Sequence, residues 1–171
     1  PKFIETDKYN LKTQVEIIAG SYKNQKAPTP PKNSWANNIE NSVNIWKIKL
    51  DKKANFILPK VDKDIKRTLY FYEGDKILVN EIEIKSRSMI EITNNNQVSI
   101  SSLENHAYIL LLQAKPINEP VVQYGPFVMN TKSEIQEAFD DYNKTNFGKW
   151  TWADDGPVHG TEYEKFSKQK L

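Results

Sequence analysis

Two histidines, His106 and His159, are the side chains of this sequence with the clearest capacity for metal chemistry. A site for divalent iron, copper or manganese needs several fixed donors around a position that stays open. His106 precedes an apolar stretch, whereas His159 lies in a polar tail, so we do not expect the two imidazoles to converge. The sequence therefore predicts neither a metal site nor a catalytic residue in this chain.

Other kinds of catalytic site are disfavoured by residue type and spacing. The six glycines never repeat at the spacing of a phosphate-binding loop, and no serine has the paired glycines of a nucleophile elbow. The absence of cysteine excludes thiolate chemistry and disulfides, and it fits a reducing cytoplasm. The carboxylates Asp154 and Asp155 are adjacent in a polar tail, where solvation is the default.

The overall composition is that of a mixed-charge chain. Its 171 residues fit one domain, and its net charge of +2 comes from 24 basic and 22 acidic residues that are interspersed. This pattern gives no reason to expect direct binding to nucleic acid, and no apolar stretch is long enough to span a bilayer. We therefore expect a cytoplasmic protein with no membrane partner. The chain begins with Pro1 and not with a methionine, which suggests a processed chain or a fragment.

Alternation of apolar and polar residues dominates the middle of the chain. Trp46, Ile48 and Leu50 point one way while the lysines between them point the other, which is typical of a strand with one buried face. Many short strands with no helix between them favour an all-β sandwich or barrel. The predicted strands are Val15 to Ala19, Trp46 to Leu50, Phe56 to Leu58, Thr68 to Tyr72, Lys76 to Val79, Ile82 to Ile84, Ile90 to Ile92, Val98 to Ile100 and Tyr108 to Gln113.

Two segments depart from this alternation. Residues Pro1 to Thr13 are polar with few apolar anchors, and we predict an irregular arm. Residues Ser21 to Asn41 form a long loop, because the prolines between Lys26 and Pro31 exclude a helix and a central strand. Loops of this length are often functional. Trp35 within the loop either anchors a partner or covers one end of the barrel.

The segment from Pro116 to Trp150 organises the end of the chain. Three prolines fix its first part, residues 116–129, which we predict to be an extended crossover and neither a helix nor a regular strand. Thr131 and Glu134 have the spacing of a capping box, so a helix should start there. Ile135, Ala138, Phe139 and Tyr142 then form one apolar stripe, and Gly148 is the predicted stop just beyond the helix.

At this point the sequence closely resembles a known family. The run from Glu119 to Thr131, Glu-Pro-Val-Val-Gln-Tyr-Gly-Pro-Phe-Val-Met-Asn-Thr, and the following Glu-Ile-x-x-Ala-Phe-x-Asp-Tyr helix resemble the signature near the C-terminus of pirin-like proteins. Trp150-Thr-Trp152 is similar to the tail of bacterial members. As signature and interdomain residues we assign Glu119, Pro120, Tyr124, Gly125, Pro126, Phe127, Met129, Asn130, Thr131, Phe139, Tyr142, Trp150 and Trp152.

The resemblance implies a fold and a position within a longer protein. Pirin-like proteins are similar to bicupins, so it implies a cupin-like double-stranded β-helix, or jelly-roll barrel, with one C-terminal α-helix. Residues 1–115 would form the barrel with its N-terminal arm, and residues 116–171 would pack on the same domain. Iron or another divalent metal is expected only in an N-terminal barrel, whose histidine-rich motif has no counterpart here. The chain thus looks like the C-terminal half.

Three functions remain open at this stage. The first is a C-terminal cupin, non-catalytic by itself, that packs against a metal-binding N-terminal cupin. The resemblance implies that the full-length protein is a quercetin 2,3-dioxygenase or a metal-dependent regulator of transcription or metabolism. The second is a stand-alone interaction module that dimerises through residues 116–152. The third is a metal-free cupin that binds a small molecule and turns Arg67, Tyr70 or Glu91 inward.

Overall fold

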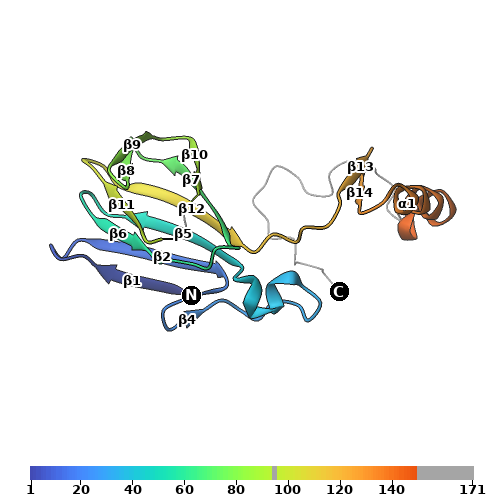
Figure 1. The fold of residues 1–171 in the computed structure, drawn as a ribbon, viewed down its shortest axis with the longest axis horizontal. Helices are drawn as coiled ribbons and strands as arrows, with labels where there is room; N and C mark the ends of the chain where they lie inside the picture. The colour runs from blue at the N-terminus through green and yellow to red at the C-terminus, as the bar shows by residue number, and fades with distance from the viewer. Residues whose placement is uncertain (94–95, 150–171) are drawn as a thin grey trace, which may run out of the picture. The chain divides into compact units, whose positions relative to one another are not determined.

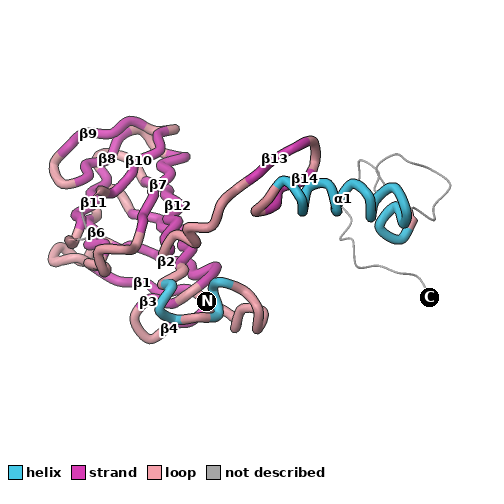
Figure 2. Tube along the Cα trace, turned by 45° about the vertical axis from the view of Figure 1, so that its right-hand side comes forward, coloured by secondary structure: helices cyan, strands magenta, loops and turns pink. Residues whose placement is uncertain are grey.

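The computed structural model describes residues 1–93 and 96–149. The chain falls into two compact units, Pro1–Ile117 and Asn118–Leu171. The first contains all the strands of the two large sheets, and the second contains a short hairpin and the long helix (Figure 2). Packing of the segment after residue 115 onto the barrel stays a prediction.

Two antiparallel sheets build the first unit (Figure 1). The six-stranded sheet contains, in spatial order, β1 (Lys2–Thr6), β2 (Lys12–Ala19), β5 (Asn44–Leu50), β12 (Ala107–Ala114), β7 (Lys66–Glu73) and β10 (Ser88–Ile92). The four-stranded sheet contains β6 (Asn55–Leu58), β11 (Val98–Ser102), β8 (Lys76–Val79) and β9 (Ile82–Lys85). This arrangement confirms the all-β prediction, and every strand predicted between Val15 and Gln113 is present.

The core lies between the inner faces of these sheets. Because side chains alternate along a strand, Trp46, Ile48 and Leu50 of β5 all enter it. Phe56 of β6 and Phe71 of β7 are fully buried, and they meet aliphatic side chains from strands of both sheets. Large apolar side chains therefore fill the interior of the unit.

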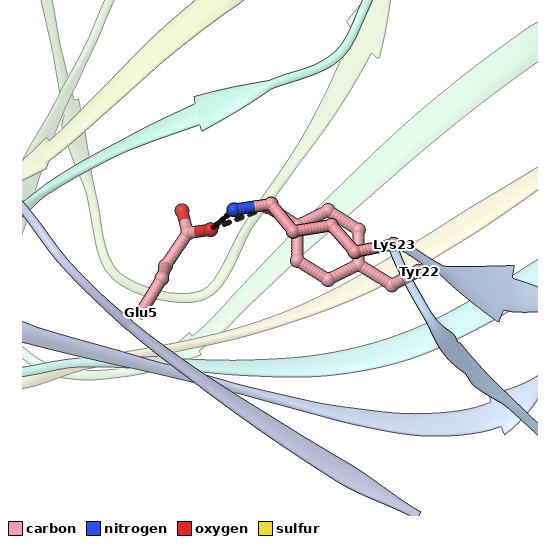
Figure 3. A network of polar contacts seen from close by, with 3 residues as sticks. All are labelled: Glu5, Tyr22 and Lys23. Atoms are coloured by element: carbon pink, nitrogen blue, oxygen red, sulfur yellow. Dashed lines mark hydrogen bonds and ion pairs between the residues drawn. The ribbon is translucent and has the colours of Figure 1, made fainter.

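The N-terminal arm is more regular than predicted. Residues Lys2–Thr6 form strand β1, which pairs with β2 so that Phe3 lies opposite Val15. Glu5 of this strand accepts hydrogen bonds from the Tyr22 hydroxyl at 2.8 Å and from the Lys23 ammonium at 2.6 Å (Figure 3). The prediction of an irregular arm is wrong, because pairing with the edge of β2 and this polar contact order a segment whose sequence carries a weak strand pattern.

The long loop from Ser21 to Asn41 contains only short elements. They are strands β3 (Ser21–Tyr22) and β4 (Gln25–Lys26) and the 3-10 turns η1 (Trp35–Asn37) and η2 (Ile39–Asn41). The Trp35 indole donates a hydrogen bond to the carbonyl of Lys115 at 3.0 Å, and the N–H of Lys115 donates to the carbonyl of Asn41 at 2.7 Å. Trp35 thus ties the loop to the chain just beyond β12.

The second unit begins with a hairpin. Strands β13 (Val122–Tyr124) and β14 (Phe127–Met129) pair across a turn at Gly125 and Pro126. The prediction of an extended crossover without regular strands is wrong here, since the turn folds the proline-rich segment back on itself. Helix α1 (Lys132–Thr145) follows, and the 3-10 turn η3 (Asn146–Gly148) comes after it. Asn146, with φ of +47°, ends the helix in place of the predicted Gly148.

No helix in the described part of the chain is both long and apolar enough to cross a membrane.

Candidate interaction surface

Polar signature residues lock the hairpin to the helix. The Asn130 side-chain amide donates to a Glu119 carboxylate oxygen at 3.1 Å and to the carbonyl of Pro120 at 2.8 Å. The N–H of Thr131 donates to the Glu134 carboxylate at 2.7 Å, and the Thr131 hydroxyl accepts from the N–H of Glu134 at 3.2 Å. The predicted capping box is confirmed. These bonds fix the direction in which α1 leaves the hairpin.

Five rings on the hairpin, α1 and η3 form an aromatic cluster: Tyr124, Phe127, Phe139, Tyr142 and Phe147. Phe139 makes edge-to-face contacts with Phe127, at a centroid distance of 4.8 Å, and with Tyr124 at 5.8 Å. Phe147 contacts Phe127 at 6.0 Å and Tyr142 at 5.4 Å. Tyr124 and Phe147 remain 68% and 62% exposed. Exposed rings that are already ordered by one another are suited to contact a further apolar surface.

The hairpin turn brings its backbone close to this cluster. Gly125 has φ of +56°, and a Cβ at this position would lie 3.4 Å from Phe139 Cζ. Glycine adopts this left-handed conformation without the steric cost that other residues meet. The pattern Tyr-Gly-Pro-Phe in the signature thus corresponds to a tight turn. This turn brings the rings of Tyr124 and Phe127 into contact with the ring of the same helix residue, Phe139.

The structure brings together most of the predicted site residues that it describes. Asn130 is joined to Glu119 and Pro120 by hydrogen bonds, Thr131 bonds Glu134 in the capping box, and Met129 is half-buried on β14 next to Asn130 in sequence. Trp150 and Trp152 lie outside the described residues. Phe147 was missed as a site residue, although its place just after the amphipathic helix was a usable signal. An interdomain role for all of these residues stays a prediction.

We predict that Phe139→Ala loosens the second unit while leaving the first intact. The substitution removes two edge-to-face contacts and a partly buried ring, which together stabilise the unit by about 2 kcal/mol. Amide hydrogen exchange should therefore become faster along α1 and unchanged in β5 and β12. Val128→Ala, on the same hairpin but 56% exposed, is the matched control. Equal protection of α1 in both variants would contradict the idea that Phe139 organises the cluster.

The described residues do not fit a divalent metal ion. No group of three or more His, Asp or Glu side chains in the described ranges comes together as a ligand set. His106 is more than half exposed, and its Nδ1 lies 3.5 Å from a carboxylate oxygen of Asp51. His159 lies outside the described residues. The inward positions of the strands, where barrel ligands would stand, hold mostly aliphatic and aromatic side chains.

The three residues proposed to line a ligand cavity point in different directions. Arg67 does face inward and is almost fully buried, and burial lowers the pKa of its guanidinium. Its Nη1 donates to the carbonyl of Pro59 at 2.8 Å and its Nη2 to the carbonyl of Asn96 at 2.9 Å. Tyr70 and Glu91 are exposed on the opposite face. The expectation that they turn inward is wrong, since the strand alternation assigns them to the outer surface.

A polar hollow of about 620 Å³ lies between the β1–β2 turn and strands β6 and β11. Asp7 on its wall is a structural residue, because its carboxylate accepts the N–H groups of Tyr9, Leu11 and Asn55. Burial opposes ionisation of Asp7, but these backbone donors and the charge of Lys8 outweigh it and lower its pKa. The Asn55 amide in turn donates to the hydroxyls of Ser99 and Ser101, both at 2.8 Å.

Comparison with known proteins shows that one family model includes most of the barrel strands, the hairpin and the helix. Residues 45–148 match the family described as the Pirin C-terminal cupin domain. Pirin-1 of Arabidopsis thaliana is 38% identical over 84 residues, an alignment that covers 46% of this chain and 29% of the relative. A crystal structure of a quercetin 2,3-dioxygenase from Acinetobacter baumannii superposes with a TM-score of 0.67 at 29% identity, covering 86% of this chain and 47% of that one.

A second Acinetobacter baumannii structure with the same description shows the fold alone. It superposes with a TM-score of 0.64 at 15% identity and covers 96% of this chain and 52% of that one. Both superpositions confirm the predicted cupin-like barrel with its C-terminal helix. The chain spans about half the length of these two solved structures.

Proposed function

The chain belongs to the family of the pirin C-terminal cupin domain, and from this membership we propose that it is the supporting, non-catalytic half of a pirin-like protein. In this proposal it packs against a metal-binding N-terminal cupin. The full-length protein is a quercetinase-type dioxygenase or a metal-dependent regulator of transcription or metabolism. The observation that carries the proposal is the family match over residues 45–148, in a chain that spans about half the length of the two solved structures.

The interior of the barrel supports a structural role. In a cupin that binds metal, donor side chains must occupy inward strand positions around an open site. Here Phe56, Leu69 and Phe71 occupy such positions, and all three are fully buried in the same hydrophobic core. The inward cation, Arg67, has two of its nitrogens bonded to main-chain carbonyls. This packing stabilises the barrel, and it leaves the chemistry of the proposed whole protein to the other half.

The first test is the intact mass and metal content of the protein as made in its source cells. The proposal expects a product about twice the length of this chain, as in the solved relatives, carrying iron or another divalent metal. A product of 171 residues without metal would overturn it. As a second measurement, the isolated chain should retain no more iron after anaerobic dialysis than its His106→Ala variant. Stoichiometric retention by the unmodified chain alone would also count against the proposal.

The aromatic cluster favours a second candidate, a stand-alone interaction module that dimerises through residues 116–152. Tyr124, Tyr142 and Phe147 are exposed large rings on one small unit, and such rings are enriched in protein interfaces. If this candidate is correct, Tyr124→Lys should convert a dimer of the 171-residue chain into a monomer. Sedimentation velocity measures the change, and a Tyr124→Lys variant that stays dimeric would contradict this candidate.

A further inference from the structure

The chain leaves the barrel through a segment without regular structure. Residues 115–121, between β12 and β13, belong to neither a strand nor a helix. Pro116 and Pro120 have no N–H to donate, and Asn118 has a positive φ of +57°. Among the described residues, Lys115 is the last one before β13 that makes a main-chain to main-chain hydrogen bond. The contacts of Lys115 therefore fix the point at which the chain leaves the barrel.

Both main-chain groups of Lys115 are bonded to the long loop between β2 and β5. The Trp35 indole donates to the Lys115 carbonyl at 3.0 Å, across 80 residues of sequence. The N–H of Lys115 donates to the carbonyl of Asn41 at 2.7 Å. We call Trp35, Asn41 and Lys115 the loop clamp. Because the two bonds hold one residue by its two main-chain groups, Lys115 stays fixed only while the loop keeps both partners in place.

The end of the loop is ordered by bonds of its own. The Asn41 side-chain amide donates to the carbonyl of Trp35 at 2.8 Å, so the two loop residues of the clamp are bonded to each other. Asn41 is only 6% exposed, and a buried amide that lost this partner would carry a desolvation cost. The side chains of Ser34 and Asn38 cap the 3-10 turns η1 and η2. These contacts keep the indole aimed at Lys115.

The loop clamp lies just beyond the regular pairing of β12 with β5. That pairing ends with Gln113 opposite Asn44. The Gln113 side chain, 7% exposed, donates to the carbonyl of Ser42 at 3.2 Å and closes this end of the sheet. Trp35, in contrast, is 39% exposed and is not part of the hydrophobic core. The indole can therefore leave Lys115 without opening the core between the two sheets.

We propose that the loop clamp is a conformational device: the Trp35 indole holds the exit of the chain from the barrel, and its release frees residues 115–117 while the barrel stays folded. Long loops inside compact domains usually have a function, and the loop from Ser21 to Asn41 would have this one. The inference goes beyond the proposed function, because it concerns contacts within the first unit and needs no N-terminal cupin.

Hydrogen exchange of single amides, followed by NMR on the 171-residue chain, is the test. Trp35→Phe keeps an aromatic ring but removes the N–H that donates to Lys115. Because one ordinary hydrogen bond is lost, local opening becomes more frequent, and the Lys115 amide should exchange about three- to tenfold faster. The amides of Ile48 in β5 and Ile109 in β12 should exchange as in the unmodified chain. Circular dichroism should show that the fold is kept.

The matched control is Ile39→Ala, on η2 of the same loop, where the side chain is 87% exposed and takes no part in the clamp. It should leave exchange of the Lys115 amide unchanged. Equal exchange of this amide in Trp35→Phe and the unmodified chain overturns the inference. Equal acceleration by both variants also overturns it, since that would show a general loosening of the loop.

Acceleration by Trp35→Phe that extends to Ile48 and Ile109 contradicts a local clamp, because Trp35 would then stabilise the whole barrel. The mass and metal content of the protein from source cells affect none of these outcomes, so the two proposals can fail separately.

Discussion

Phe56→Ala should lower the free energy of unfolding of the first unit by about 3–5 kcal/mol, the range found when a fully buried phenylalanine is truncated. Phe56 stands on β6 and is completely buried between the two sheets. Its ring lies 6.0 Å from that of Tyr22, which is itself fixed by the Glu5 contact, so neighbouring side chains have little freedom to fill the space. Urea unfolding should show a lower midpoint at an unchanged slope.

The matched control is Ile57→Ala, one residue further along β6. Ile57 points to the opposite face and is 42% exposed, so the same kind of truncation should cost no more than about 1 kcal/mol. If both variants lose the same stability, the interior is not the tightly filled core described above. The supporting role proposed for this barrel would then lose its main physical argument.

Arg67→Met should be the second strongly destabilising change, at about 2–3 kcal/mol. The substitution removes two charge-assisted hydrogen bonds and leaves the carbonyls of Pro59 and Asn96 without these donors. Removal of a buried cation also relieves a desolvation cost, which is why we expect less than the full sum of two bonds. Urea unfolding measures the difference. Pro59 directly follows β6, and Asn96 lies shortly before β11. Arg67 therefore joins the end of β6 to the segment that leads into β11.

Two further variants make this prediction specific. Lys66→Met, next to Arg67 but exposed on β7, should change the stability by about 0.5 kcal/mol or less. Arg67→Lys keeps a cation but loses the planar fork that reaches two carbonyls, so its stability should fall between those of the unmodified chain and Arg67→Met. An Arg67→Met variant as stable as the Lys66→Met control would show that the guanidinium has no structural role and would reopen a ligand-binding role for it.

Local sequence patterns determined most of the barrel. Strict alternation such as that of Trp46, Ile48 and Leu50 permits only one buried face, and the observed strand β5 buries these three residues. The start of α1 was equally predictable, because the capping box between Thr131 and Glu134 is a local interaction over one helical turn. The family resemblance also rested on a contiguous run of residues, from Glu119 to Thr131, and the match over residues 45–148 confirmed it.

Tertiary structure decided the features that depend on residues far apart in sequence. The arm became strand β1 because β2 offered an open edge, and the order of strands in the sheet decided that Met89, Tyr70 and Leu110 form one surface. Likewise, no local pattern revealed that Arg67 would bond carbonyls 8 and 29 residues away. Alternation identifies the buried face where only one face is apolar, as on β5, but on β12, where both faces are apolar, only the packing of both sheets determines which face is the core.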